Sequence, residues 1–152
     1  MTIGVISDTH GLLRPQAVAA LQGADLILHA GDVGDRDILD RLGAVAPTVA
    51  VRGNVDTAVW TTALPMTEVV EVGGLCLYML HDRAALDLDP MAAGFAAVIF
   101  GHSHRAGAEL RDGVLFLNPG SAGPRRFSLP ITVARLTVSG ATLSYEIVEL
   151  TV

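Results

Sequence analysis

Short apolar runs that end at glycine or at a polar residue alternate with helix-like segments along the first third of the chain. These runs predict buried strands at residues 2–7, 25–29 and 48–52. The intervening segments predict helices at residues 14–21 and 35–45. Pro15 suits the first turn of the first helix, and acidic residues early in the second suit the helix dipole. This order predicts a mostly parallel sheet with right-handed crossovers.

The second half of the chain has a pattern typical of antiparallel pairs. Gly73-Gly74 separates two strand-like runs, which predicts a hairpin. A short helix is expected over residues 84–92. Further strands are expected at residues 66–72, 75–80, 96–100, 107–111, 114–117, 131–138 and 141–149. The predicted fold class is therefore α/β, with two packed mixed β-sheets flanked by helices.

The composition supports a single domain over residues 1–152. Hydrophobic residues make up 51% of the chain and charged residues 17%, which excludes a disordered chain. No apolar run approaches the roughly 20 residues of a membrane-spanning helix, so no membrane association is expected. The first residues show no signal-peptide pattern, and Cys76 is the only cysteine, so we expect a cytoplasmic protein. Cys76 itself is interpreted as a small buried hydrophobe.

The net charge argues against one class of partner. The chain has 16 acidic and 10 basic residues, for a formal net charge of −6. Proteins that bind long nucleic acids through phosphates need a basic surface. Binding to a long nucleic acid is therefore not expected.

Polar side chains follow five of the predicted strands, at the point where each strand ends. In an open α/β sheet, ligands bind beyond the carboxyl ends of the strands. Side chains two residues apart in an extended segment point to the same side, so each D-x-H or H-x-H pair is expected to aim at one place. Seven side chains are thus predicted to meet at one rim: Asp8, His10, Asp32, Asn54, His81, His102 and His104.

This donor set predicts metal chemistry. Carboxylate, imidazole and amide donors without cysteine suit divalent cations such as Mn²⁺, Fe²⁺, Zn²⁺ or Ni²⁺. Seven ligands exceed one tetrahedral zinc site, and they suit two metal ions about 3.5–4 Å apart that share a carboxylate.

The ordered motifs D-x-H, G-D, G-N-x-D, H and G-H-S-H, with N-P-G-S at residues 118–121, resemble those of the calcineurin-like metallophosphoesterase superfamily. The resemblance covers residues 3–121 and is strongest to the small YfcE-type phosphodiesterases. It implies one metal ion held by Asp8, His10, Asp32 and His104. It implies a second ion held by Asp32, Asn54, His81 and His102, with Asp32 bridging the two.

The resemblance also implies an activity. A hydroxide activated by two divalent ions, Mn²⁺ in preference to Zn²⁺, Fe²⁺ or Ni²⁺, would attack the phosphorus of a small phosphodiester in line. The residues implied as catalytic are Asp32, Asn54 and His102. The small members of the family often form dimers, so a homo-oligomer is possible.

Two positions depart from the family pattern. Many members have histidine after G-N as a general acid, where this chain has Val55. Valine cannot donate a proton, so we expect a preference for phosphodiesters and activated aryl leaving groups over unactivated alkyl monoesters. The second departure is at His81, which the family places beside glycine, whereas here Leu80 and Asp82 flank it.

Two other functions stay open. One is a non-catalytic scaffold, since a retromer subunit of the superfamily has decayed metal ligands; the presence of all seven ligands here argues against it. The other is a phosphomonoesterase or nucleotide phosphatase.

Several residues near the motifs have more than one interpretation. Asp56 would cap a helix that follows it or take part in catalysis. His29 is expected to support the core or the site. Asn118–Ser121 would form a simple turn or support the metal loops. Three arginines would either contact a substrate phosphate or lie in solvent: Arg14, Arg125 and Arg126.

Overall fold

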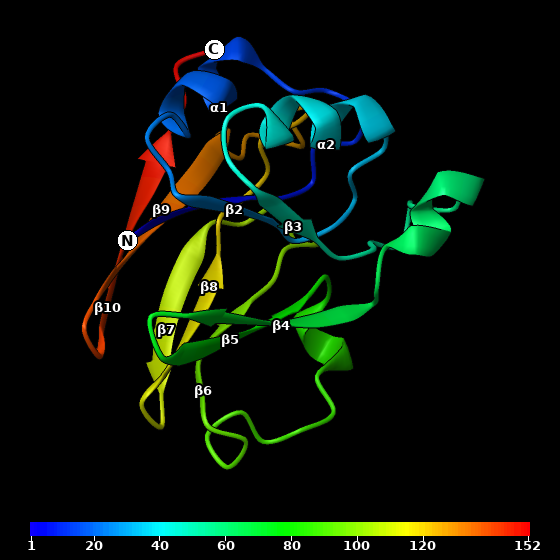
Figure 1. Ribbon diagram of the computed structural model, residues 1–152. Coiled ribbons are helices and arrows are strands. Elements are labelled where there is room, and N and C mark those ends of the chain that lie inside the picture. The colour runs from blue at the N-terminus through cyan, green and yellow to red at the C-terminus, as the bar shows by residue number, and fades with distance from the viewer.

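Two five-stranded mixed sheets face each other in the computed structural model, which describes all 152 residues (Figure 1). The first sheet has the order β10-β9-β1-β2-β3 and the second the order β4-β5-β6-β8-β7. β1 to β3 are mutually parallel, and so are β5, β6 and β8. The strands are β1 (Thr2–Ile6), β2 (Leu26–His29), β3 (Thr48–Ala50), β4 (Thr67–Val72), β5 (Leu75–Leu80), β6 (Phe95–Ile99), β7 (Gly107–Arg111), β8 (Val114–Asn118), β9 (Thr132–Ser139) and β10 (Thr142–Glu149). The predicted fold class is confirmed.

The main core lies between the two sheets, because alternate strand residues point to opposite faces. In β5, Leu77 and Met79 belong to this core, whereas Tyr78 and Leu80 belong to a smaller cluster on the other face of the second sheet. Burial of each large aliphatic side chain contributes about 1.5–3 kcal/mol. The sheets are thereby held at a fixed distance, and so are the loops at their ends.

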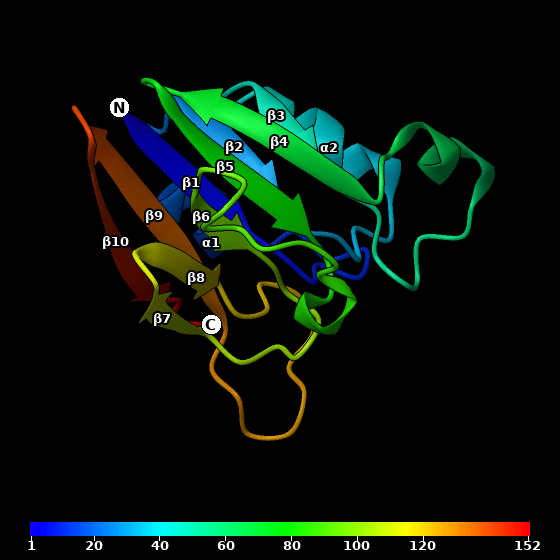
Figure 2. The same ribbon diagram turned by 90° about the horizontal axis from the view of Figure 1, so that it is seen from below.

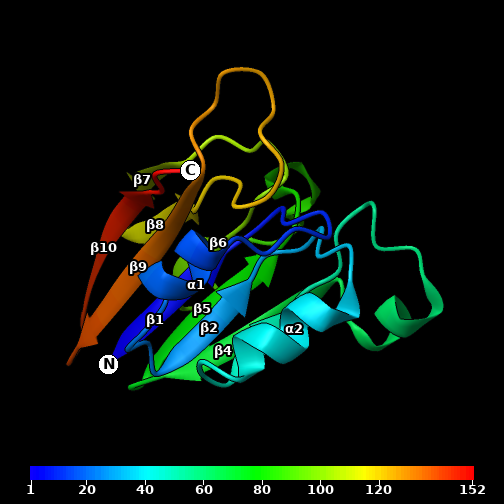
Figure 3. The ribbon, with the colours of Figure 1, turned by 90° about the horizontal axis from the view of Figure 1, so that it is seen from above.

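Two α-helices cover the outer face of the first sheet (Figure 3). They are α1 (Pro15–Ala20) and α2 (Arg36–Gly43). The Asp35 carboxylate caps α2 by accepting a hydrogen bond from the backbone N–H of Asp37, at 3.0 Å. Ile38 and Leu42 of this helix are buried against the sheet. Neither helix has the length or the apolar run that a membrane span requires.

The helix predicted over residues 84–92 is wrong. Only a 3₁₀ turn, η2 (Arg83–Ala85), forms there, and an irregular loop follows it. Asp89 accepts hydrogen bonds from the backbone N–H groups of Met91 and Ala92, which competes with helix formation. Pro90 further disfavours a helical conformation at the residue before it. This loop, and not a helix, covers the outer face of the second sheet.

The prediction that Cys76 is buried is also wrong. Cys76 is half-buried near the start of β5, where its neighbour Leu75 is half-buried too. The remaining four residues of β5 are buried, so the strand enters the core only after Cys76.

Parallel strands of both sheets end at the same edge of the molecule. Figure 2 shows β2 and β5 running toward this edge. Backbone hydrogen bonds join the loops that follow the strands: Asp8 N–H donates to Gly31 at 3.0 Å, and Gly101 N–H donates to His81 at 2.9 Å. The two sheets are also joined there, because the His102 N–H donates to the Asp8 carboxylate at 3.1 Å. Loops distant in sequence therefore meet at this edge.

Candidate metal centre

Three histidines surround one oxygen of Asp8. The distance from Asp8 Oδ1 to Nε2 is 3.5 Å for His104, 3.7 Å for His81 and 3.8 Å for His10. Asp8 is fully buried, and its Oδ2 accepts hydrogen bonds from the Ser7 hydroxyl and from the His102 N–H. These bonds fix the carboxylate so that Oδ1 faces the three rings.

Asp32 provides a second carboxylate at the same place. Its Oδ2 lies 3.2 Å from His81 Nε2 and 3.5 Å from His10 Nε2. Its Oδ1 accepts a hydrogen bond from the backbone N–H of Val55 at 3.0 Å. One oxygen is thus held by the neighbouring loop, while the other faces two rings at once.

Asn54 and His102 form the open side of the cluster. His102 Nδ1 lies 3.3 Å from Asn54 Oδ1, and both residues are exposed. The His102 ring is 5.2 Å from the His81 ring, centre to centre. The structure therefore brings all seven predicted side chains to one edge, five in a tight group and two beside His81.

The backbone around these side chains is not extended, so the predicted reason for their common direction is wrong. Positive φ angles turn the chain at five of the seven positions: Asp8 (56°), His10 (45°), Asp32 (57°), His102 (73°) and His104 (63°). Such angles place a residue in the left-handed region, which non-glycine residues seldom adopt. The side chains converge because of tight left-handed turns and not because of strand periodicity.

The buried donors fit a divalent metal ion. Asp8 Oδ1 and His81 Nε2 are buried and have no hydrogen-bond partner. The other ring nitrogen of His81 is 2.7 Å from the Ala30 carbonyl, so it carries the proton and leaves Nε2 with a lone pair that faces the site. An unpartnered buried polar atom costs about 1–3 kcal/mol. Two groups of ligand atoms lie within 4.8 Å of one another: Asp8, His10 and His104, and Asp8, Asp32 and His81.

Burial and mutual charge shift the pKa values of these groups in opposite directions. Burial raises the pKa of Asp8. Burial alone would raise the pKa of Asp32 too, but the nearby His81 ring and the hydrogen bond from Val55 lower it below its ordinary value. Burial, reinforced by the nearby charge of Arg126, lowers the pKa of His104 to about 4. His104 is therefore a neutral imidazole at pH 7, the form that binds metal ions.

His81 has the opposite behaviour. Burial alone would lower its pKa, but the nearby carboxylates of Asp32 and Asp8 raise it. A proton on His81 and a cation at its Nε2 are therefore alternatives for balancing the two carboxylates. Metal binding at this nitrogen must displace protons.

Asp56 is neither a helix cap nor placed among the seven. The segment after it forms a 3₁₀ turn, η1 (Val59–Ala63), that begins after Ala58 and has no side-chain cap. Asp56 is 4% exposed, and its carboxylate accepts hydrogen bonds from three backbone N–H groups: Val33 at 3.2 Å, Gly34 at 3.1 Å and Gly53 at 2.9 Å. It thereby joins the loop of Asp32 to the loop of Asn54.

His29 and Asn118 hold the loops of the candidate ligands in place through hydrogen bonds. His29 is fully buried between the Thr9 hydroxyl, at 3.0 Å, and the Gly31 N–H, at 3.1 Å, which confirms its predicted supporting role. Asn118 Nδ2 donates to the Gly101 carbonyl at 3.0 Å and to the Ser103 hydroxyl at 3.1 Å. Of the two interpretations of the N-P-G-S motif, support for the metal loops is the correct one.

Sequence reasoning missed Ser7 and, within the N-P-G-S motif, the specific contact that Ser121 makes. The Ser7 hydroxyl orients Asp8, as described above, and the Ser121 hydroxyl donates to the Asp8 backbone carbonyl at 3.0 Å. Ser7 ends an apolar run, and Ser121 belongs to the N-P-G-S motif. The position of Ser7 next to the predicted ligand Asp8 could have indicated its contact, whereas no local pattern indicates the partner of Ser121.

The three arginines near the motifs differ in their surroundings. Arg14 is half-buried and donates to the Gly123 carbonyl at 3.3 Å. Arg125 is exposed and donates to the Leu129 carbonyl at 3.1 Å. Arg126 is exposed, and its charge acts on His104. Arg126 is thus the arginine with an electrostatic link to the centre.

Comparisons with known proteins agree with this geometry. Residues 1–141 match the calcineurin-like phosphoesterase superfamily domain. A probable metallophosphoesterase of Methanocaldococcus jannaschii is 39% identical over 134 residues, which cover 80% of this chain and 68% of the relative.

Solved structures show the same fold. An archaeal phosphodiesterase has a TM-score of 0.81 and 22% identity, covering 97% of this chain and all of the other. Vps29 of Entamoeba histolytica in complex with Zn²⁺ has a TM-score of 0.76 and 24% identity, covering 98% and 99% of the two chains.

Proposed function

Because this chain belongs to the calcineurin-like phosphoesterase superfamily, we propose that it is a phosphodiesterase that uses two divalent metal ions to hydrolyse small phosphodiesters. The observation that carries the proposal is the pair of buried carboxylates, Asp8 and Asp32, facing the Nε2 atoms of three histidines. So many buried acceptors facing one another would cost free energy unless a cation or protons balance them.

The proposed ligands follow the family pattern. We assign the first ion to Asp8, His10, Asp32 and His104, and the second to Asp32, Asn54, His81 and His102. The position of Asp32 Oδ2 near rings of both groups supports its role as the bridge. We propose Mn²⁺ as the metal, since these donors suit a borderline to hard cation.

When bound, two such ions supply an activated water and stabilise negative charge on the phosphoryl oxygens. The chain's own part is to hold the carboxylates and rings in place. The Val55 N–H fixes Asp32, and the Val55 side chain offers no proton to a leaving group. We therefore expect kcat/KM to be higher on bis-p-nitrophenyl phosphate than on an unactivated alkyl monoester, and the reverse order would contradict the assignment as a phosphodiesterase.

One experiment tests the proposal directly. The protein is purified without chelator, its metal content per chain is measured, and hydrolysis of bis-p-nitrophenyl phosphate is assayed with added Mn²⁺. Asp32→Asn and His104→Ala are expected to lose more than about 100-fold in kcat/KM, because even the residues behind metal ligands contribute 10–100-fold. Asp87→Asn, at an exposed aspartate outside the centre, is the matched control and keeps full activity. Equal turnover by all four proteins would refute the catalytic assignment.

A non-catalytic scaffold is the second candidate, and the likeness of the fold to Vps29 is the observation that favours it. The presence of all seven candidate ligands supports catalysis instead. For partners, we propose a small phosphodiester substrate and no long nucleic acid, in keeping with the net charge of −6. Size-exclusion chromatography with light scattering would test the proposed homo-oligomer.

A further inference from the structure

A cavity of about 260 Å³ opens directly beside the second proposed metal position. Three of its lining residues are members of the seven: Asn54, His81 and His102. A group attached to a phosphate held at the centre would therefore reach this cavity without crossing solvent.

The rest of the wall is mostly apolar. Met66, Leu80 and Ala85 line it, and Met66 is 61% exposed at its rim. Arg52 contributes a flat guanidinium, which is fixed because Nε and Nη2 both donate to the Leu64 carbonyl, at 3.3 and 3.1 Å. A guanidinium held in this way offers a planar face on which a ring can stack.

The wall carries one positive and one negative side chain, whose charges offset each other. Arg52 carries one positive charge, and the Asp82 carboxylate lies in the same wall with one oxygen fixed by the Ala84 N–H at 2.9 Å. The wall therefore favours a neutral group over a second phosphate. Its size sets a further limit, because a cavity of about 150 Å³ already holds benzene.

From these features we infer that the cavity is the subsite for one ester group of the substrate and that it selects a neutral, aryl-sized ring. This inference rests on the proposed function, since it assigns the place of the ester group of the same phosphodiester. Asp82 and Ala85, which lie outside the family motifs, thereby become determinants of specificity.

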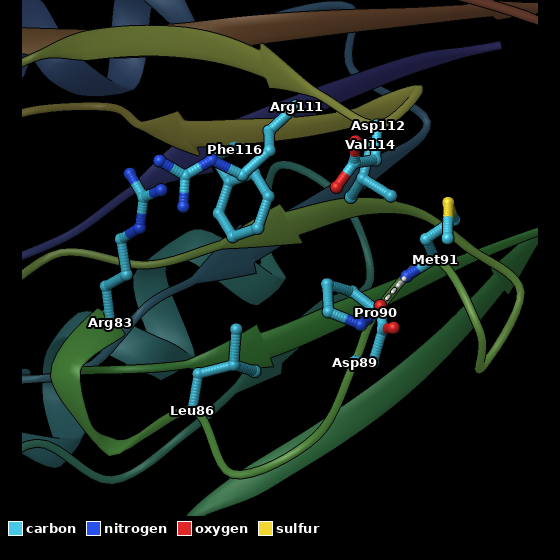
Figure 4. A pocket seen from close by; sticks show the side chains of 9 residues that line it. All are labelled: Arg83, Leu86, Asp89, Pro90, Met91, Arg111, Asp112, Val114 and Phe116. Carbon is cyan, nitrogen blue, oxygen red and sulfur yellow. Dashed lines mark hydrogen bonds between the residues drawn. The ribbon is translucent and has the colours of Figure 1, made fainter.

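Two cavities are larger than this one. The first, of about 430 Å³, is lined mainly by residues of α2 and η1 and by none of the seven candidate ligands. The second cannot take this role either. It has a volume of about 400 Å³ and lies on the outer face of the second sheet, between Arg83, Phe116 and the loop around Pro90 (Figure 4). The Arg83 guanidinium lies 4.3 Å from the centre of the Phe116 ring and pairs with Glu109 at 3.0 Å. None of the seven candidate ligands lines it.

Binding of two small phosphonates tests the inference without any turnover. Isothermal titration calorimetry on the Mn²⁺-loaded protein compares phenylphosphonate with methylphosphonate. The two ligands differ only in the group bound to phosphorus, which is a phenyl ring in one and a methyl group in the other. Partial burial of one ring is expected to favour phenylphosphonate by about tenfold. Ala85→Phe fills the cavity and is expected to abolish this preference. Ala84→Phe is the matched control, because the neighbouring Ala84 is also exposed but does not line the cavity.

A second variant tests the same cavity in case Ala85→Phe does not fold. Met66→Glu places a charge at the exposed rim and is expected to lower the preference at least threefold. Equal affinity of the unmodified protein for both phosphonates would overturn the inference, as would loss of the preference in Ala84→Phe alone.

The two proposals fail separately. Hydrolysis of bis-p-nitrophenyl phosphate without a ring preference overturns the subsite and leaves the phosphodiesterase standing. A ring preference without any hydrolysis overturns the phosphodiesterase and leaves a binding site for aryl phosphonates.

Discussion

Replacing Asp56 by asparagine tests how the two central loops are joined. The Asp56 carboxylate accepts three backbone N–H groups, through Oδ2 from Val33 and Gly53 and through Oδ1 from Gly34. Asparagine has only one acceptor oxygen. If that oxygen faces Val33 and Gly53, its NH₂ group meets the Gly34 N–H, and one hydrogen bond is replaced by contact between two donors.

The expected loss follows from these contacts. Hydrogen bonds to charged groups contribute about 1.5–3 kcal/mol each. One such bond is lost in Asp56→Asn, and the other two lose their charge. The free energy of unfolding should therefore fall by about 2–4 kcal/mol, a large part of the roughly 5–15 kcal/mol of a typical domain. For a chain of this length, Tm should fall by about 4–16 °C.

Urea unfolding and thermal melting measure this change. Asp35→Asn is the matched control, because Asp35 is an exposed helix cap where asparagine serves as well as aspartate. Its free energy of unfolding should change by no more than about 0.5 kcal/mol, the range of ordinary surface substitutions. The same midpoint for both variants would refute the reasoning that Asp56 joins the loops.

Three further outcomes are expected. Burial lowers the pKa of His29 from its ordinary 6.5 to about 4, so the unfolded chain takes up a proton first as the pH falls; urea unfolding from pH 7 to pH 4 should show a loss of about 3 kcal/mol that is missing in His29→Gln. An added Cβ at Gly101 would lie 2.7 Å from Asp8 Oδ2, so Gly101→Ala should lose Mn²⁺ binding by calorimetry, whereas Gly107→Ala, with open space at its Cβ, should keep it. Asn118→Asp removes the amide donor that holds the G-H-S-H loop, and a Mn²⁺ affinity that stays within twofold would contradict that role.

The strands and the rim of polar residues could be predicted because their signals are local. An apolar run that ends in Asp8 or Asp32 shows both the strand and the place where it stops. The hydrogen-bond partners of Asp56 and Ser121 could not be predicted in the same way. Their hydrogen bonds join positions 22 and 113 residues apart, and no periodic pattern carries that information.

The wrong prediction of a helix has a different cause. Residues 84–92 are rich in good helix formers, but one aspartate side chain and one proline act on single backbone groups. The left-handed turns could not be predicted from the sequence either, because positive φ angles are expected at glycine and not at His10 or His104.

The left-handed backbone at Asp8, His10, Asp32, His102 and His104 sets stability against activity. A non-glycine residue in this conformation costs about 1–2 kcal/mol, whereas glycine adopts it freely. Glycine at His10 or His104 would relieve this cost and would also remove a candidate metal ligand. Under the proposed function, laboratory evolution for heat resistance alone should therefore tend to discard these side chains, so each round needs an activity screen.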